Sequence, residues 1–191
     1  LKYNLDIKHT PLLKRKIIVT VSCILGFVIA LCGIYLIGYK AAFNNAEKGE
    51  FETAKKYLFI PFITEFHDPN LVTYVNTGIL LGQRQFDLAE RGFASLSGYL
   101  NSEQLVKESK YRHAAQLADA NNFDEAIMIY EQLSKEKYKD SGNLILDSRY
   151  RKGVYFLYEM RDYSSAEGIF NALKKYGYEK ADEMCLETYY L

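Results

Sequence analysis

The chain has 191 residues, and its 24 Lys and Arg are balanced by 24 Asp and Glu, so its formal net charge is zero. That balance argues against a nucleic-acid-binding protein built on a uniformly basic surface, and no nucleic-acid partner is expected. With 49% hydrophobic residues, the chain is also unlike a disordered acidic tail. Its three widely spaced cysteines exclude a disulfide-stapled small domain and a four-thiolate zinc site.

The first long element is an uncharged run over residues 17–39. At about 1.5 Å per residue, a helix of this length reaches roughly 34 Å, which spans a hydrocarbon core of about 30 Å. A buried helix of a soluble protein is the alternative, but such helices rarely run this long without a polar face. We therefore predict a transmembrane helix over residues 17–39, which makes the lipid bilayer one partner of the chain.

The charges on the two sides of this run differ. Residues 1–16 hold five basic side chains and one acidic side chain (+4), whereas residues 40–191 hold 19 basic and 23 acidic side chains (−4). Lys and Arg resist translocation, and Lys14, Arg15 and Lys16 stand at the boundary of the run. The sequence predicts a basic cytoplasmic tail, a single crossing of the plasma membrane with the N-terminus inside, and an extracytoplasmic domain over residues 40–191.

A repeat with a spacing of 35–39 residues follows the apolar run. Each unit begins at a tyrosine, which we call the origin tyrosine, and has a compact residue three positions later. An aromatic residue comes 12 or 13 positions after the origin, then alanine after three more, a large apolar residue after four more, and leucine or proline after three more. The six columns are Tyr39, Tyr74, Tyr111 and Tyr150; Ala42, Thr77, Ala114 and Gly153; Phe51, Phe86, Phe123 and Tyr163; Ala54, Ala89, Ala126 and Ala166; Leu58, Phe93, Tyr130 and Phe170; Pro61, Leu96, Leu133 and Leu173.

These columns predict helix pairs. The second half of each unit has apolar residues at positions 0, 3, 7 and 10, which form one face of a helix. The compact residue in the first half lets the two helices approach closely. Because one pair cannot bury its own apolar face, the pairs are expected to stack. No useful length of chain alternates with period two, so we expect an all-α fold without a sheet.

Local signals place three helix starts. Asn101, with Gln104 three positions later, predicts an N-cap with a capping box. Asn122, with Glu125 three positions later, predicts an N-cap with a capping box before the second helix of the third unit. Asp68 followed by Pro69 is typical of an N-cap and the first helical residue.

The phrases GEFETAKKYL, RQFDLAERGF, NNFDEAIMIY and RDYSSAEGIF resemble the second-helix signature of the tetratricopeptide repeat (TPR). The resemblance covers most of residues 39–191. The form of these repeats is similar to divergent repeats of membrane-anchored bacterial proteins, particularly of Gram-positive lineages. The proline that usually closes each unit is absent, and units three and four end in tyrosine-containing linkers at 137–141 and 177–181. The resemblance implies a solenoid of about four TPR-like helix pairs, and a further helix over 181–190 is expected to cap it.

Few residues suggest catalysis. His67 lies between Glu65 and Asp68, which allows a catalytic or metal-binding hypothesis, although a loop with a helix cap explains the same residues. Cys185 is the one cysteine after the apolar run, and a buried, unreactive thiol is the simpler interpretation. No phosphate-binding glycine loop, nucleophile elbow or zinc-protease motif is present. We therefore expect a protein that is not an enzyme and needs no metal or cofactor.

By analogy with the TPR, the first helix of each unit is expected to line a concave groove. The resemblance places seven side chains there: Tyr74, Glu108, Tyr111, Asp119, Asp147, Tyr150 and Tyr158. Tyrosines with acidic neighbours would suit a protein or peptide that carries Lys or Arg. The alternative is that the origin tyrosines only pack between units.

Together these features predict a membrane-anchored scaffold or adaptor that binds a protein or peptide. A different hypothesis is that the chain forms the outer and membrane-proximal part of a longer receptor or sensor, whose cytoplasmic domain precedes Leu1. A thiol- or metal-dependent hydrolase using Cys185 or His67 is a third hypothesis.

Overall fold

The computed structural model describes residues 11–58 and 68–190, and these residues form helices joined by short turns, with no strand among them. The all-α fold class is therefore confirmed for the described residues. The chain divides into two compact parts, which are treated separately below. We call Leu1–Val75 the N-terminal part and Asn76–Leu191 the C-terminal part.

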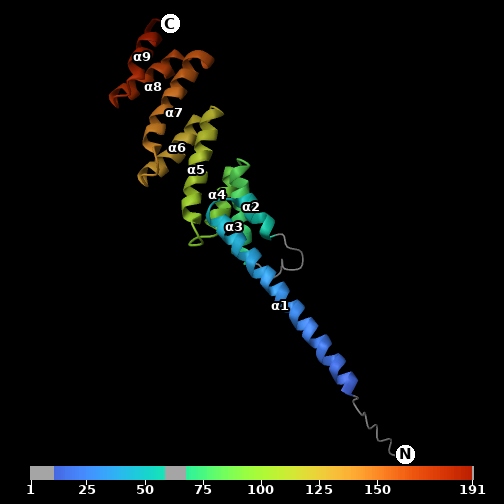
Figure 1. Ribbon diagram of the computed structural model, residues 1–191. Helices are drawn as coiled ribbons and strands as arrows, with labels where there is room; N and C mark the ends of the chain where they lie inside the picture. Colours follow the sequence, from blue (N-terminus) through green and yellow to red (C-terminus); the bar gives the residue numbers. More distant parts are fainter. Residues whose placement is uncertain (1–10, 59–67, 191) are drawn as a thin grey trace, which may run out of the picture. The chain divides into compact units, whose positions relative to one another are not determined.

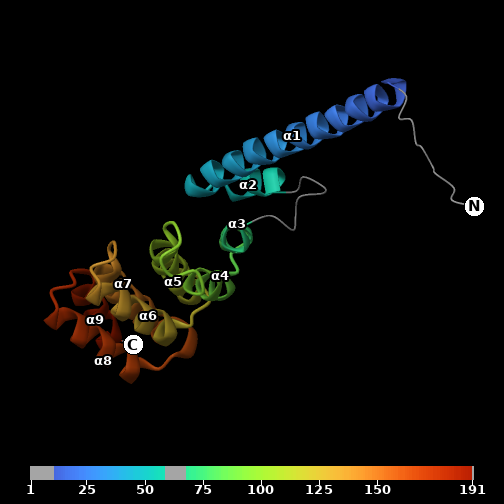
Figure 2. The same cartoon turned by 90° about the horizontal axis from the view of Figure 1, so that it is seen from below.

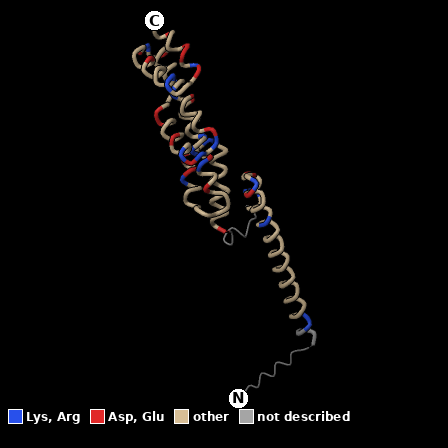
Figure 3. Tube along the Cα trace, turned by 90° about the vertical axis from the view of Figure 1, so that its left-hand side faces the viewer, with Lys and Arg blue, Asp and Glu red and all other residues tan. Residues whose placement is uncertain are grey.

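The N-terminal part is built on α1 (Pro11–Glu47), a single helix of 37 residues. Its aliphatic side chains from Ile17 to Ile37 are exposed, from 41% at Leu31 to 74% at Ile37. This helix is long and apolar enough to cross a membrane. Figure 3 shows how little charge interrupts it. A water-exposed apolar surface of this size is unfavourable.

The apolar helix does not end at Tyr39 but continues to Glu47. Beyond Tyr39 it acquires a buried face, because Ala42 and Ala46 are completely buried and α1 packs on α2 (Phe51–Leu58). The predicted membrane helix and the first helix of the first repeat are therefore one continuous helix. The N-terminal part also contains the beginning of α3 (Pro69–Gly82).

The C-terminal part contains the rest of α3 and the helices from α4 to α9, each of which packs on the next (Figures 1 and 2). Their bounds are α4 Phe86–Ala94, α5 Ser102–Asp119, α6 Phe123–Lys135, α7 Ser141–Tyr155, η2 Phe156–Met160, α8 Tyr163–Lys175 and α9 Lys180–Tyr190. Within the part of the chain that the structure describes, η2 is the one π-helix.

The repeat columns are the core. The alanine column is completely buried in all four units, and the large apolar column has at most 7% exposure. Leu96, Leu133 and Leu173 of the last column are also buried, whereas Pro61 lies outside the described residues. The compact column is tightly packed: a Cβ added to Gly153 would lie 2.7 Å from Cε1 of Phe170. The predicted close approach of paired helices is confirmed there.

The turn inside each helix pair also recurs. A residue with a left-handed backbone stands two positions before each aromatic of the third column, namely Gly49, Arg84, Asn121 and Arg161. In the third unit, for example, the Asn122 N–H donates to the carbonyl of Leu117 at 2.8 Å, which closes the helix end in a Schellman turn. The same backbone device therefore ends the first helix of each pair.

The fourth unit enlarges this turn by one residue. Its origin tyrosine and third-column aromatic are 13 positions apart instead of 12. The extra residue is absorbed by η2, and the Asp162 N–H reaches back to the carbonyl of Phe156 at 2.9 Å. A π-helix accommodates such single-residue insertions. As a consequence Tyr163 is 38% exposed, whereas Phe123 at the equivalent place is 5% exposed.

The linkers between pairs share a second motif. A left-handed residue, then a tyrosine, precede by three positions a completely buried small residue that begins or nearly begins the next helix. The three sets are Gly98, Tyr99 and Ser102; Lys137, Tyr138 and Ser141; Gly177, Tyr178 and Ala181. Sequence reasoning found the tyrosine in two of these linkers and missed Tyr99.

The three predicted helix starts fare differently. Asn101 precedes α5, but its side chain makes no capping hydrogen bond, so the predicted capping box with Gln104 is wrong. Asp68 caps α3, because its carboxylate accepts the Asn70 N–H at 2.9 Å. Asn122 does precede α6, but its side chain makes no capping hydrogen bond, so the predicted capping box with Glu125 is wrong. The backbone turn at Asn121 already closes this corner. In the fourth unit Asp162 does cap α8 by accepting the Ser165 N–H at 3.1 Å.

Candidate functional site

The C-terminal part contains a cleft of about 410 Å³ between the α5–α6 turn and α7–η2. Aromatic rings dominate its walls. It is lined by Asn121, Phe123, Tyr150, Arg151, Val154, Tyr155, Tyr158 and Glu159. We call it the aromatic cleft. Concave surfaces with aromatic walls and a few fixed polar groups are typical of ligand sites.

One cation is already fixed in the aromatic cleft. The guanidinium of Arg151 donates to the carbonyl of Ala118 at 3.0 Å and to Asp119 at 3.1 Å, and it lies 5.8 Å from the centre of the Phe123 ring. Arg151 therefore joins α7 to the end of α5. Because its charge is paired with Asp119, the remaining charge among the lining residues is that of the exposed Glu159.

Two tyrosines at the aromatic cleft have raised pKa values, and one of them is held as a hydrogen-bond donor. The Tyr158 hydroxyl donates to Glu187 at 2.5 Å, and this bond, with a smaller effect of burial, raises the pKa of Tyr158 to about 12. Burial raises the pKa of Tyr150 as well, and the negative charges of Glu183, Glu187 and Asp147 raise it further. Both phenols are therefore neutral at physiological pH, and carboxylates surround them.

The predicted residues Glu108 and Tyr111 belong to a different arrangement, in which the residues 137–140 linker folds back on α5. Glu108 accepts hydrogen bonds from Tyr138 at 2.7 Å, Lys139 at 2.5 Å and Arg112 at 2.7 Å. Tyr111 donates to Asp140 at 2.7 Å, and the Lys139 ammonium lies 4.5 Å from the centre of its ring. We call this group the Glu108 cluster.

The charges of the Glu108 cluster are strongly coupled. Burial alone would raise the pKa of Glu108, but the hydrogen bonds from Lys139, Tyr138 and Arg112 outweigh it and lower the pKa to about 2. Burial, followed by the bond to Asp140, raises the pKa of Tyr111 to about 12. The charged groups here are paired with one another, which is the chemistry of a clamp rather than of an open binding site.

The fourth unit repeats this arrangement in a weaker form. Asp147, which stands three residues before Tyr150 as Glu108 does before Tyr111, accepts from Tyr178 at 3.4 Å. The Tyr150 and Tyr178 rings lie 5.5 Å apart, and the Lys180 ammonium is 5.9 Å from the centre of the Tyr150 ring.

The seven predicted groove residues thus separate. Tyr150 and Tyr158 line the aromatic cleft, and Asp119 reaches it through Arg151. Four others do not: Glu108 and Tyr111 form the clamp, Asp147 holds a linker, and Tyr74 is completely buried. The prediction that Tyr74 is exposed in a groove is wrong. Its ring centre lies 5.7 Å from that of Phe51 inside the N-terminal part. At this position the alternative, that an origin tyrosine is a packing residue, is correct.

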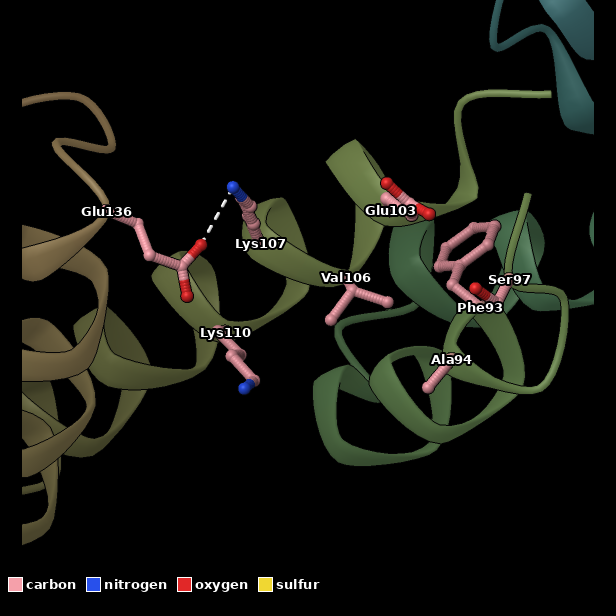
Figure 4. A pocket seen from close by; sticks show the side chains of 8 residues that line it. All are labelled: Phe93, Ala94, Ser97, Glu103, Val106, Lys107, Lys110 and Glu136. Atoms are coloured by element: carbon pink, nitrogen blue, oxygen red, sulfur yellow. Dashed lines mark ion pairs between the residues drawn. The ribbon is translucent and has the colours of Figure 1, made fainter. Parts of the chain in front are cut away.

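A second cleft, of about 360 Å³, lies along α4 and α5 and reaches the end of α6 (Figure 4). Both of its lysines are paired: Lys107 binds Glu136 of the same cleft at 2.7 Å, and Lys110 binds Glu90 outside it at 3.6 Å. Phe93 is its one aromatic lining residue, and it is completely buried. This cleft offers a ligand less aromatic surface than the aromatic cleft.

The residues considered for catalysis show no activated nucleophile. Burial raises the pKa of the Cys185 thiol, which is opposite to what a reactive thiolate needs, and the thiol lies 3.6 Å from the side-chain oxygen of Asn171. His67 lies outside the described residues. Within the described residues, no group of three His, Cys, Asp or Glu could hold a metal ion.

Sequence reasoning missed Arg151, Phe123 and Tyr155 as cleft residues. Phe123 was identified only as a core column, and Arg151 follows an origin tyrosine without any motif. They come together because α7 packs on α6 and Arg151 reaches the end of α5, contacts between helices that no local pattern records. No family model, curated protein or solved protein structure matches this chain. Function must therefore be argued from its own residues.

Proposed function

We propose that this chain is a membrane-anchored scaffold that uses a TPR-like solenoid to bind protein segments bearing Lys or Arg. The observation that carries the proposal is the aromatic cleft, with its neutral tyrosines and surrounding carboxylates. Aromatic walls bind the stem and charge of a basic side chain, and carboxylates at the rim attract it. No catalytic step is required.

The solenoid part of the proposal rests on recurrence. The four repeat units share buried columns and the same left-handed turn within each pair. In the C-terminal part, each helix from α4 to α9 packs on the next. These features favour about four stacked TPR-like pairs, since each pair leaves an apolar face that the next pair covers.

The anchoring part rests on α1. Its aliphatic side chains from Ile17 to Ile37 are exposed, and Lys14, Arg15 and Lys16 precede them. We place residues 1–16 in the cytoplasm and the repeats outside the plasma membrane, according to the positive-inside rule. Because α1 runs without interruption into the first repeat, the membrane helix would hold the scaffold at the bilayer surface. Tethering would raise the effective concentration of bound segments there.

The proposal can be tested with the full chain in lipid nanodiscs and four fluorescent nonapeptides. The peptides differ only in their central residue, which is Lys, Arg, norleucine or Glu. We expect the Lys and Arg peptides to bind about tenfold more tightly than the norleucine peptide, because only they add a charge to the same aliphatic stem. The Glu peptide should bind most weakly. Fluorescence anisotropy measures the four affinities.

The variant Tyr158→Ala should remove most of this preference, since it deletes one wall of the aromatic cleft. Tyr176→Ala is the matched control, because Tyr176 is 66% exposed and lies outside the cleft. Equal affinities for all four peptides, or a preference that survives Tyr158→Ala unchanged, would contradict the proposal.

A further inference from the structure

In the N-terminal part, α2 folds back along the end of α1 and packs on it, so the two helices form a hairpin (Figures 1 and 2). The buried face of α1 begins at Gly38 and continues through Ala42 and Ala46, and α2 contributes Ala54 and Leu58. The eight residues of α2 rise about 12 Å, which is also the rise from Gly38 to Ala46 on α1. The end of α2 therefore returns to the level of the last residues of the apolar run.

Three lysines lie at this open end of the hairpin. Lys55 and Lys56 belong to the last turn of α2, and Lys40 is the first residue after the apolar run. All three side chains are exposed. In the part of the chain that the structure describes, none of them forms an ion pair with a carboxylate. Their charges are therefore available to a partner.

The opposite end of the hairpin, at the turn between α1 and α2, is acidic. Its charged residues are Glu47, Glu50 and Glu52, with Lys48. A carboxylate at the start of α3, Asp68, is close enough to the open end to act electrostatically on Tyr39, but it caps its own helix by accepting the Asn70 N–H at 2.9 Å. Three lysines against this one carboxylate leave the open end positive, so charge is separated along the hairpin.

Aromatic rings lie at the same boundary. Tyr35, Tyr39 and Phe43 follow one another along one face of α1, with successive ring centres 6.2 Å and 6.4 Å apart. On α2, Tyr57 follows Lys56 and is 43% exposed. Tyrosine favours the headgroup layer of a bilayer because its ring is apolar and its hydroxyl is polar. The combination of lysines and tyrosines at the end of an apolar helix is thus suited to a membrane surface.

We propose that Lys40, Lys55, Lys56 and Tyr57, which we call the headgroup patch, bind the headgroups of anionic phospholipids. The lysines would meet the phosphates, and the ring of Tyr57 would lie among the glycerol groups. The acidic turn would be repelled by the same lipids, which keeps the hairpin upright on the leaflet. The patch would give the first helix pair a second contact with the bilayer besides α1. This inference rests on the proposed membrane anchor and holds for either orientation of α1.

The test uses the absence of tryptophan from the chain, since one introduced tryptophan then reports its own surroundings. The full chain with Tyr57→Trp is placed in nanodiscs of phosphatidylcholine and phosphatidylglycerol, in which one lipid or the other carries bromine as a fluorescence quencher. We expect brominated phosphatidylglycerol to quench more strongly, with a preference over phosphatidylcholine of at least about fivefold. A single lysine near an anionic surface accounts for about this factor.

Charge variants in the Tyr57→Trp chain identify the residues responsible. Lys55→Gln together with Lys56→Gln should lower the preference for phosphatidylglycerol by about fivefold or more. Lys48→Gln is the matched control, because Lys48 is equally exposed but lies at the acidic turn, and it should change nothing. A salt concentration of about 1 M should weaken the preference, since exposed charges are then screened.

Phe27→Trp separates this inference from the anchor on which it rests. Phe27 is 66% exposed within the apolar run, so this tryptophan should be quenched by both lipids alike. Its failure to be quenched would contradict the anchor itself. Quenching of Phe27→Trp without quenching of Tyr57→Trp would leave the anchor and refute the headgroup patch. Equal quenching of Tyr57→Trp by both lipids, or a loss of preference as large in Lys48→Gln as in the double variant, would refute it too.

Discussion

The third and fourth helix pairs follow one plan and yet end in different surfaces. Both place an origin tyrosine beside the large aromatic of the partner helix, with ring centres 5.9 Å apart for Tyr111 and Tyr130 and 5.8 Å apart for Tyr150 and Phe170. Both bring a linker tyrosine to a carboxylate. The differences therefore lie in a few residues and not in the packing scheme.

Those few residues decide which pair is closed. Glu108 collects three donors, whereas Asp147 has one long bond from Tyr178 at 3.4 Å. At the opposite end, the fourth pair gains a residue through η2 and has Tyr158 at the place that Asp119 occupies in the third pair. The third pair is thus fixed by charge at its linker, while the fourth pair is opened at its turn into the aromatic cleft.

The compact column offers the sharpest test of this comparison. Ala114 fits in the third pair, but Gly153→Ala should destabilise the fourth pair by about 1–3 kcal/mol despite the better helix propensity of alanine. The new methyl group would meet the Phe170 ring at 2.7 and 2.9 Å. Urea unfolding of the full chain in detergent, followed by hydrogen exchange of α7 and α8, measures the loss.

Gly168→Ala provides the control on the same helix pair. A Cβ at Gly168 would have no neighbour within 4 Å, so propensity alone acts and α8 should become more stable by up to about 1 kcal/mol. If both variants shift stability in the same direction, the close approach of α7 and α8 is not what requires glycine.

The Glu108 cluster predicts the next largest effect. Glu108→Gln should cost about 1–2 kcal/mol near neutral pH, because three donors lose a charged acceptor at a side chain that is only 16% exposed. Asp147→Asn, the equivalent change in the fourth pair, should cost within about 0.5 kcal/mol because a single long bond is affected.

The pH dependence gives this difference a sign. The pKa of Glu108 is about 2 in the folded chain against an ordinary value of 4.5, so folding favours the ionised form. Its stabilisation is complete above about pH 4.5 and is lost as the pH falls toward 2. Acid unfolding curves should be flatter over this window in Glu108→Gln than in wild type, with Asp147→Asn unchanged. Parallel curves for all three proteins would assign the acid sensitivity elsewhere.

The periodic part of the fold could be predicted from sequence, because burial of an apolar face leaves a regular pattern. Ala54, Ala89, Ala126 and Ala166 recur for this reason, and all are completely buried. The turns could not be predicted, because left-handed geometry at Arg84 and Arg161 has no glycine to announce it. The capping role fell to Asp162 and not to Asn122, since a cap bond depends on local backbone angles that one residue type does not fix.

The candidate site was harder still. Tyr150 and Tyr158 were found because they belong to the first helices, but Tyr74 has the same column position and is buried. Whether an origin tyrosine packs or faces solvent depends on which neighbouring side chains cover it. Such contacts join α5 to the residues 137–140 linker, about 30 positions apart, and no local pattern records them.

The smallest predicted change in stability tests the origin of the aromatic cleft. Met160 is the last residue of η2, which absorbs the extra residue of the fourth pair, and it is 56% exposed. Deleting it should restore the 12-residue spacing and replace η2 by an α-helical turn. The free energy of unfolding should change by less than about 1 kcal/mol, because no buried side chain is removed.

The same deletion should abolish the Lys preference of the nonapeptides, since Tyr158 and Glu159 rotate relative to Phe123 when the turn shortens. Ala120 precedes the left-handed Asn121 in the third pair, as Met160 precedes the left-handed Arg161 in the fourth. Deletion of Ala120 should be strongly destabilising, because this turn contains no extra residue and α6 would lose its register. If removing Met160 leaves peptide preference intact, the aromatic cleft does not depend on the enlarged turn. The difference between the two pairs would then reside in the side chains alone.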